Sequence, residues 1–159
     1  MNPLDRSRNA PADAWAASLE GRVAELRAQG YGCSQVVLAI GMARLGLEDP
    51  DLLRAMEGYC GGACGGTCGA LCGGAALFGL CLGKGSPEEP RSESMKGFVG
   101  ELAKCFAGRW GASTCDGVIH SDPDLHRELC PRLMAETVWT VWGILEANGL
   151  PAGERSPGR

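Results

Sequence analysis

The chain has 159 residues, a length that suits one domain built around one hydrophobic core. The formal net charge is −4 and 45% of the residues are hydrophobic, which is typical of a soluble globular protein without a basic surplus. Nucleic acids and anionic membrane surfaces are bound by clustered Lys and Arg, so we expect neither as a partner. The longest apolar stretch, residues 70–82, is interrupted by glycines and is too short to span a bilayer.

The two ends of the chain differ in composition from the middle. Residues 1–11 are polar, contain proline and include no apolar segment of the kind that directs secretion. We therefore expect a flexible arm at the start of a cytoplasmic protein. Residues 150–159 are predicted to form a flexible tail, and residues 12–149 a single helical domain.

Apolar residues in the first part of the chain recur at helical spacing. They predict an amphipathic helix within residues 15–30 and a second, more apolar helix over residues 33–45. Asp49 followed by Pro50 is typical of a helix cap and a first helical position, and predicts a short helix toward Met56.

The middle of the chain is rich in glycine and cysteine. Residues 57–66 contain too much glycine to favour a helix, so they are predicted to form a turn or loop. A helix is predicted to start near Thr67 and to end at Leu82. Its glycines and alanines would let neighbouring helices approach closely.

Helical periodicity also dominates the last third of the chain. Residues 86–89 resemble a capping box that opens a helix, whose apolar face continues over residues 95–110. A break follows at residues 111–113, residues 121–124 form another predicted helix start, and Pro131 is predicted to open the last helix, over residues 131–149. Because no segment alternates with period two, we predict an all-α fold: a compact helical bundle of about five to seven helices with a glycine/cysteine-rich central loop and helix.

The nine cysteines are the most unusual feature of the composition. An odd number fits a closed disulfide framework poorly, and structural disulfides are rare in a reducing compartment. We therefore expect metal binding or thiol redox chemistry, with some cysteines as core residues. The cysteines are Cys33, Cys60, Cys64, Cys68, Cys72, Cys81, Cys105, Cys115 and Cys130.

Several cysteines lie at predicted helix starts. Cys33, Cys68 and Cys130 each open or directly precede a predicted helix, and Cys115 lies in the break before another. The free N–H groups and the positive dipole end of a helix N-terminus favour a thiolate over a thiol. The thiolate is both the nucleophile and the metal ligand, so these positions are candidate site residues.

Cys60, Cys64, Cys68 and Cys72 are spaced by four residues. On a continuous helix they would form one stripe, in which neighbours could bind one metal or bridge a cluster. In a loop, the glycines around Cys60 and Cys64 would instead let backbone N–H groups approach cluster sulfurs.

The other candidate side chains have simpler interpretations. Cys81 should point away from this stripe and Cys105 lies beside an apolar helix face, so we predict core packing for both. His120 and His126 are the only histidines, and a structural or solvent-facing role is favoured over metal binding for each.

Four blocks of the sequence, taken in order, resemble the C_GCAxxG_C_C family of redox-active proteins. The blocks are residues 30–37 around Cys33, 66–73 around Cys68, 109–115 ending at Cys115, and 130–133 beginning at Cys130. The resemblance implies a helical fold and a redox role without specifying a substrate. This chain also carries cysteines beyond the four blocks, which favours a cluster or a larger metal site over a simple dithiol.

The leading hypothesis is a redox protein that holds an iron–sulfur cluster of undetermined type, because four thiolates are the usual ligand set. Cys33, Cys68, Cys115 and Cys130 are the main candidate ligands. Additional or substitute ligands are Cys60, Cys64 and Cys72. No C-x-x-C-H motif is present, so we expect no covalent haem.

Two alternatives stay open: a metal-free thiol–disulfide protein or sensor, and a Cu(I) or Zn(II) module. The sequence contains no arrangement of nucleophile and base that specifies an enzyme, so an oxidoreductase and an electron carrier are both compatible with it. The expected partners are a redox protein or a small-molecule substrate. The glycine-rich helix faces are compatible with packing between two chains, which makes a homodimer a further expectation.

Overall fold

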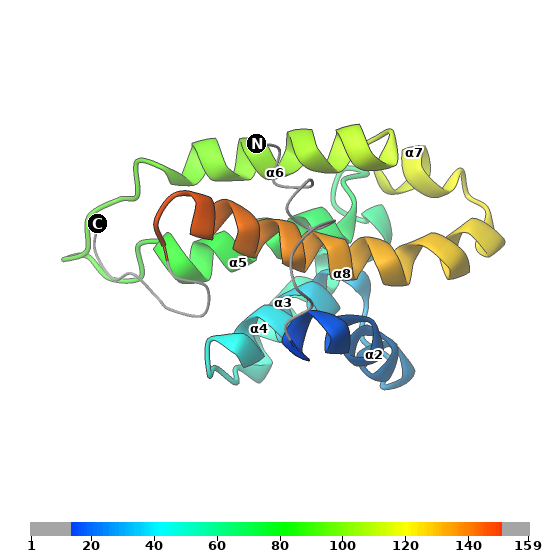
Figure 1. The fold of residues 1–159 in the computed structure, drawn as a ribbon, viewed down its shortest axis with the longest axis horizontal. Coiled ribbons are helices and arrows are strands. Elements are labelled where there is room, and N and C mark those ends of the chain that lie inside the picture. Colours follow the sequence, from blue (N-terminus) through cyan, green and yellow to red (C-terminus); the bar gives the residue numbers. More distant parts are fainter. Residues whose placement is uncertain (1–13, 151–159) are drawn as a thin grey trace.

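The computed structural model describes residues 14–150, with side chains from residue 18 onward, so the predicted arm at 1–11 and the predicted tail after Leu150 lie outside the described residues. The described residues form seven α-helices, one short 3₁₀ helix and no β-strand, which confirms the all-α prediction (Figure 1). None of these helices is long and apolar enough to cross a membrane. In chain order the elements are α2 (Ala14–Ala28), α3 (Cys33–Arg44), α4 (Pro50–Met56), the 3₁₀ helix η1 (Glu57–Gly62), α5 (Gly69–Leu82), α6 (Met95–Trp110), α7 (Cys115–Ile119) and α8 (Pro123–Ala147).

Helices α3, α5 and α8 enclose the core. α3 packs along α5, and α8 packs against both, with α6 on one side and α2 and α4 on the other (Figure 1). Phe78 of α5 and Leu133 of α8 are almost fully buried between them. Gly73 permits the close approach of α5 to α3, because a Cβ there would lie 2.6 Å from the carbonyl oxygen of Ser34. This contact holds the N-terminal turns of α3 and α5 together.

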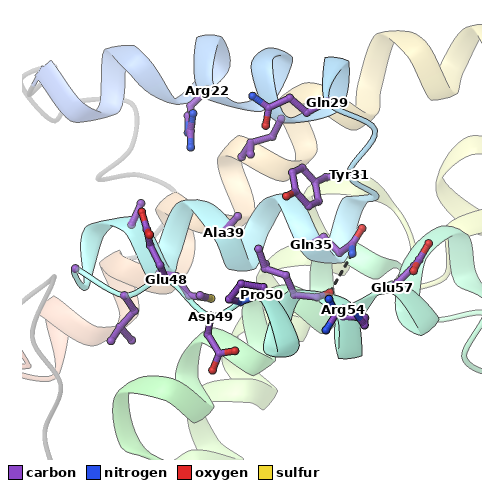
Figure 2. A pocket seen from close by; sticks show the side chains of 16 residues that line it. Arg22, Gln29, Tyr31, Gln35, Ala39, Glu48, Asp49, Pro50, Arg54 and Glu57 are labelled. Atoms are coloured by element: carbon purple, nitrogen blue, oxygen red, sulfur yellow. Dashed lines mark hydrogen bonds between the residues drawn. The ribbon is translucent and has the colours of Figure 1, made fainter.

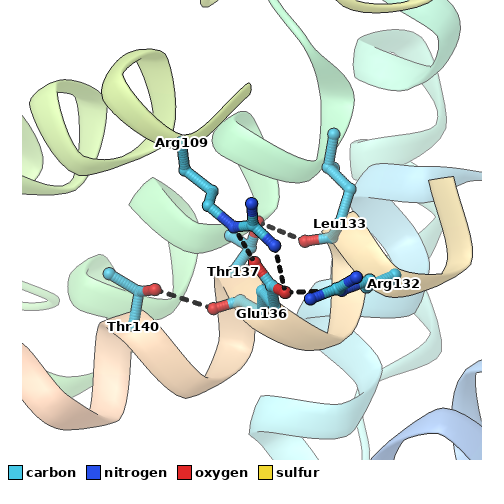
Figure 3. Close-up of polar contacts among 6 residues, drawn as sticks. All are labelled: Arg109, Arg132, Leu133, Glu136, Thr137 and Thr140. Carbon is cyan, nitrogen blue, oxygen red and sulfur yellow. Dashed lines mark hydrogen bonds and ion pairs between the residues drawn. The ribbon is translucent and has the colours of Figure 1, made fainter. Parts of the chain in front are cut away.

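An ion-pair network joins the C-terminal part of α6 to α8 (Figure 3). Nε of Arg109 donates to Oε2 of Glu136 at 2.9 Å, and Nε of Arg132 donates to Oε1 of the same carboxylate at 2.8 Å. Burial acts to raise the pKa of Glu136, but the hydrogen bonds from the two guanidinium groups outweigh it and lower the pKa. The network fixes the end of α6, from which the chain passes into the segment that carries Cys115.

The predicted helix start at residues 86–89 is wrong. The chain forms a turn there, and α6 begins only at Met95, after Ser94. The Glu89 carboxylate does reach back to the backbone N–H of Gly85, at 2.6 Å, as a capping residue would. Pro90 follows, however, and its ring disfavours the helical conformation of the preceding residue. The capping interaction therefore closes a turn instead of a helix.

The predicted start of the last helix at Pro131 is also wrong. α8 begins at Pro123, where the Asp122 carboxylate accepts hydrogen bonds from the N–H groups of Asp124 and Leu125, and it continues through Pro131. A proline inside a helix removes one backbone hydrogen bond, and here burial of the following turn outweighs that cost. Cys130 therefore lies inside a helix and is not a helix cap.

Helix α4 follows its predicted boundaries, and its cap supports a first test. The Asp49 carboxylate accepts a hydrogen bond from the N–H of Leu52 at 3.0 Å. We expect Asp49→Ala to lower the free energy of unfolding by about 1 kcal/mol, because it removes this cap. Urea unfolding measures the change, with Glu48→Ala, at the exposed neighbouring position, as the control. Equal losses in the two variants would contradict a specific capping role.

Candidate redox centre

Seven cysteines lie around the N-terminal ends of α3 and α5 and the loop between α4 and α5. We refer to this set as the cysteine centre. Cys33 is the first residue of α3, Cys68 is the N-cap of α5, and Cys115 is the first residue of α7. Cys130 lies in the second turn of α8 and interacts electrostatically with Cys33 and Cys115. The remaining members are Cys60 in η1, Cys64 in the following turn, and Cys72 in α5.

Backbone pairing joins the segment before Cys68 to the segment before Cys115. The N–H of Cys68 donates to the carbonyl of Ser113 at 2.9 Å, and the N–H of Cys115 donates to the carbonyl of Gly66 at 2.8 Å. An isolated antiparallel bridge between Thr67 and Thr114 completes the pairing. Two cysteines that are far apart in sequence are thereby held beside each other.

Glycines make room for three of the cysteine side chains. A Cβ on Gly69 would lie 2.3 Å from Sγ of Cys33, and a Cβ on Gly32 would lie 2.2 Å from Sγ of Cys60. Gly62 has a positive φ of 76°, and a Cβ there would lie 2.8 Å from Cβ of Cys115. These glycines are needed for close packing against the sulfurs.

Ser34 is a member of the site that the sequence analysis missed. Its hydroxyl is fully buried and donates to the carbonyl of Met56 at 2.6 Å. Because a hydroxyl has one proton, its oxygen then accepts from the S–H of Cys60, with Oγ and Sγ 3.0 Å apart. A small polar residue next to Cys33 in an otherwise apolar helix was the available signal.

The predicted turn at residues 57–66 forms the outer wall of the centre. It consists of η1 and further turns, with Gly61, Gly62, Gly65 and Gly66 at positive φ. Cys64 is exposed on this wall, and Tyr59 beside it is 41% exposed. Solvent can therefore reach the centre from this side.

Burial controls the protonation of the inner thiols. It raises the pKa of Cys68 to about 12 and the pKa of Cys130 to about 11, and the nearby thiols of Cys33 and Cys115 add to both shifts. The backbone N–H groups of Ala70 and Leu71, at the start of α5, lower the pKa of Cys68 and so oppose part of this shift. Cys68 and Cys130 are therefore neutral thiols at pH 7. A cation placed among them would favour their thiolates.

The raised pKa values predict alkaline destabilisation of the reduced, metal-free protein. An ordinary cysteine has a pKa of 9.0, so above pH 9 the unfolded chain loses protons that folded Cys68 and Cys130 retain. We expect the free energy of unfolding to be unaffected by these groups below pH 9. Above it, the free energy should fall by about 1 kcal/mol per pH unit for each thiol, until the pH reaches the folded pKa.

Urea unfolding on both sides of pH 9 checks this expectation. The matched control is the Cys68→Ala, Cys130→Ala double variant, in which the lysines and tyrosines still titrate. For each protein, the free energy of unfolding is plotted against pH. The difference between the two slopes isolates the contribution of the two thiols. Identical slopes would show that burial does not hold these thiols protonated.

The other cysteines and the histidines lie apart from this centre. Cys81 is 3% exposed and belongs to the hydrophobic core, whereas Cys105 is only half-buried, in a crevice between α6 and α8. His120 is exposed, and His126 lies on the surface at the start of α8. Among the described residues, no three Cys, His, Asp or Glu side chains converge closely enough to hold one metal ion.

A cleft of about 900 Å³ lies between α2, α3 and α4 (Figure 2). Tyr31 and Gln35 line it, but none of its described lining residues is a cysteine. The Gln35 amide accepts from the N–H of Gly32 and donates to the carbonyl of Leu53, each at 3.0 Å. Gly32 contacts Cys60 on its other side, so Gly32 and Gln35 separate the cleft from the cysteine centre.

The described residues form an all-α domain in which seven thiols surround two helix N-termini. The protein is therefore a small, cysteine-rich helical protein with one sulfur centre. The chain belongs to the C_GCAxxG_C_C family of putative redox-active proteins, whose sequence pattern matches residues 31–144. The match includes the whole cysteine centre and confirms the resemblance seen in the sequence. Comparison with curated proteins and with solved structures gave no match.

Proposed function

We propose that the cysteine centre binds an iron–sulfur cluster and that the protein uses it to transfer electrons to a partner protein or to a small molecule. The observation that carries this proposal is the grouping of four thiols: backbone pairing holds the segments of two of them together, and two are buried in one core cluster against which a third packs. They are Cys33, Cys68, Cys115 and Cys130.

The donor set fits a cluster better than a single ion. Four thiolates are the usual ligands of [2Fe–2S] and [4Fe–4S] clusters, with two thiolates on each iron in the first and one on each iron in the second. They can therefore lie further apart than the ligands of one tetrahedral Zn(II). Among the described residues no three-ligand group for one ion is present, whereas a tetrahedral Zn(II) site needs four ligands around the same ion.

The surrounding residues would tune such a site. A bound cluster supplies one-electron redox chemistry. The buried side chains around Cys68 and Cys130 exclude water, and the backbone N–H groups of Ala70 and Leu71 at the start of α5 favour the Cys68 thiolate. Burial and hydrogen bonds to sulfur are two of the factors that set a cluster's potential.

A metal-free thiol–disulfide protein is less well supported at the inner positions. Such chemistry begins with a thiolate, which a lowered pKa provides. Burial instead raises the pKa of Cys68, Cys72, Cys115 and Cys130, with additional repulsion from neighbouring thiols. These four cysteines are better suited to ligation by a cation that displaces their protons.

The test is purification of the full chain without air, followed by a visible spectrum and quantification of iron, acid-labile sulfide, copper and zinc. We expect broad sulfur-to-iron absorption with iron and sulfide in comparable amounts. A colourless protein that takes up no iron after anaerobic reconstitution would refute the proposal. Copper or zinc in that sample would then favour the metal module.

A further inference from the structure

Cys60 is not needed by the four-thiol set, yet it lies next to one of its members. A Cβ on Gly69 would lie 2.3 Å from Sγ of Cys33 and 3.2 Å from Cα of Cys60. Both atoms therefore lie close to the same position beside Gly69. The Cys60 sulfur packs against Gly32, the residue before Cys33. The two glycines therefore leave the space between these cysteines free of other side chains.

We propose that Cys33 and Cys60 form a reversible disulfide when the protein meets hydrogen peroxide or a related hydroperoxide. Rotation about the Cα–Cβ bond of Cys60 turns its sulfur from Gly32 toward Cys33. This rotation breaks the weak contacts of the Cys60 S–H group with the Ser34 hydroxyl and, at 3.9 Å, with the Met56 carbonyl, whereas the Ser34 hydroxyl keeps its own bond to the Met56 carbonyl. The conformational cost is therefore small.

The reaction consumes one peroxide for each disulfide. One of the two cysteines loses its proton and attacks the peroxide oxygen as a thiolate, which breaks the O–O bond and gives a sulfenic acid; the departing hydroxide takes up the released proton as water. The second sulfur then attacks the sulfenic sulfur, and the S–O bond breaks as the second water leaves. Two thiols lose two electrons and two protons, and the peroxide is reduced to two waters.

Burial explains why this pair reacts and not Cys68 or Cys130. Cys33 and Cys60 are half-buried, whereas Cys68 and Cys130 are only 6% and 8% exposed. Cys60 lies on the accessible η1 side of the centre. The disulfide needs no cluster, but one consequence rests on the proposed function: it would remove Cys33 from the ligand set and so prevent cluster assembly under oxidising conditions.

Peptide mapping tests the pairing directly. The purified full chain is treated with hydrogen peroxide, its free thiols are alkylated, and it is digested with trypsin. Residues 28–44 form a tryptic peptide whose single cysteine is Cys33, and residues 55–84 form a peptide that carries Cys60 together with Cys64, Cys68, Cys72 and Cys81. Fragmentation of the linked pair in the mass spectrometer therefore identifies which of these five cysteines is joined to Cys33. We expect a covalent link between the two peptides that disappears on reduction.

Cys60→Ser and Cys64→Ser form a matched pair of variants in the same loop. The link should be lost in Cys60→Ser and retained in Cys64→Ser, with the helical circular dichroism of both variants unchanged. A link that survives in Cys60→Ser, or wild-type protein with Cys60 fully alkylated after oxidation, would overturn the pairing. Iron and sulfide content, measured on the untreated protein, reports on the cluster separately, so either proposal can fail without the other.

Discussion

The Cys68→Ser variant is expected to lose the visible absorption and nearly all of the iron and sulfide of the anaerobically purified protein. Cys68 is the most constrained thiol of the centre, because it occupies the N-cap position of α5 and is only 6% exposed. Serine keeps the size and the cap but supplies no thiolate, which is the ligand that iron–sulfur clusters require. Iron and sulfide analysis together with the visible spectrum measure the loss.

Cys105→Ser is the control for that experiment. It makes the same chemical change at a cysteine in the crevice between α6 and α8, away from the cysteine centre. It should retain wild-type iron and sulfide, and far-ultraviolet circular dichroism should show both variants to be helical. Full iron content in Cys68→Ser would rule out Cys68 as a ligand, and equal loss in both variants would point to a folding defect.

Gly69→Ala is expected to destabilise the metal-free protein by about 1–3 kcal/mol, because it inserts a methyl group into a filled space. The new Cβ would lie 2.3 Å from Sγ of Cys33 and 2.7 Å from the backbone carbonyl oxygen of Tyr59. The Cys33 side chain can rotate, but the Tyr59 backbone can move only with η1. We therefore also expect a reduced capacity to bind iron, since Cys33 is displaced.

Gly79→Ala provides the matched control in the same helix. Gly79 is exposed, and no atom lies within 4 Å of the position of its added Cβ. Alanine there should raise the free energy of unfolding by about 0.5–1 kcal/mol through helix propensity alone. The free energy of unfolding measured in urea should therefore fall for Gly69→Ala and rise for Gly79→Ala. A stabilised Gly69→Ala protein would show that the contact between Gly69 and Cys33 is not tight.

Helix positions were largely predictable because their signals are local. Asp49 and Pro50 marked the start of α4 correctly, since a cap and a fixed φ act within one turn. The same kind of reasoning failed at residues 86–89 and at Pro131. At both places, residues beyond the local motif decided the outcome: Pro90 stopped the predicted helix, and core packing carried α8 through its proline.

The sequence by itself determined the helical class, the family and the importance of the cysteines, because periodicity, composition and motif order are local or additive properties. Only the tertiary structure decided which sulfurs are neighbours. The pairing of Gly66 with Cys115, the contact of Gly69 with Cys33 and the hydrogen bond of Ser34 to Cys60 all join residues distant in the chain. Such contacts depend on how α3, α5 and α8 pack together, and no short segment encodes that packing.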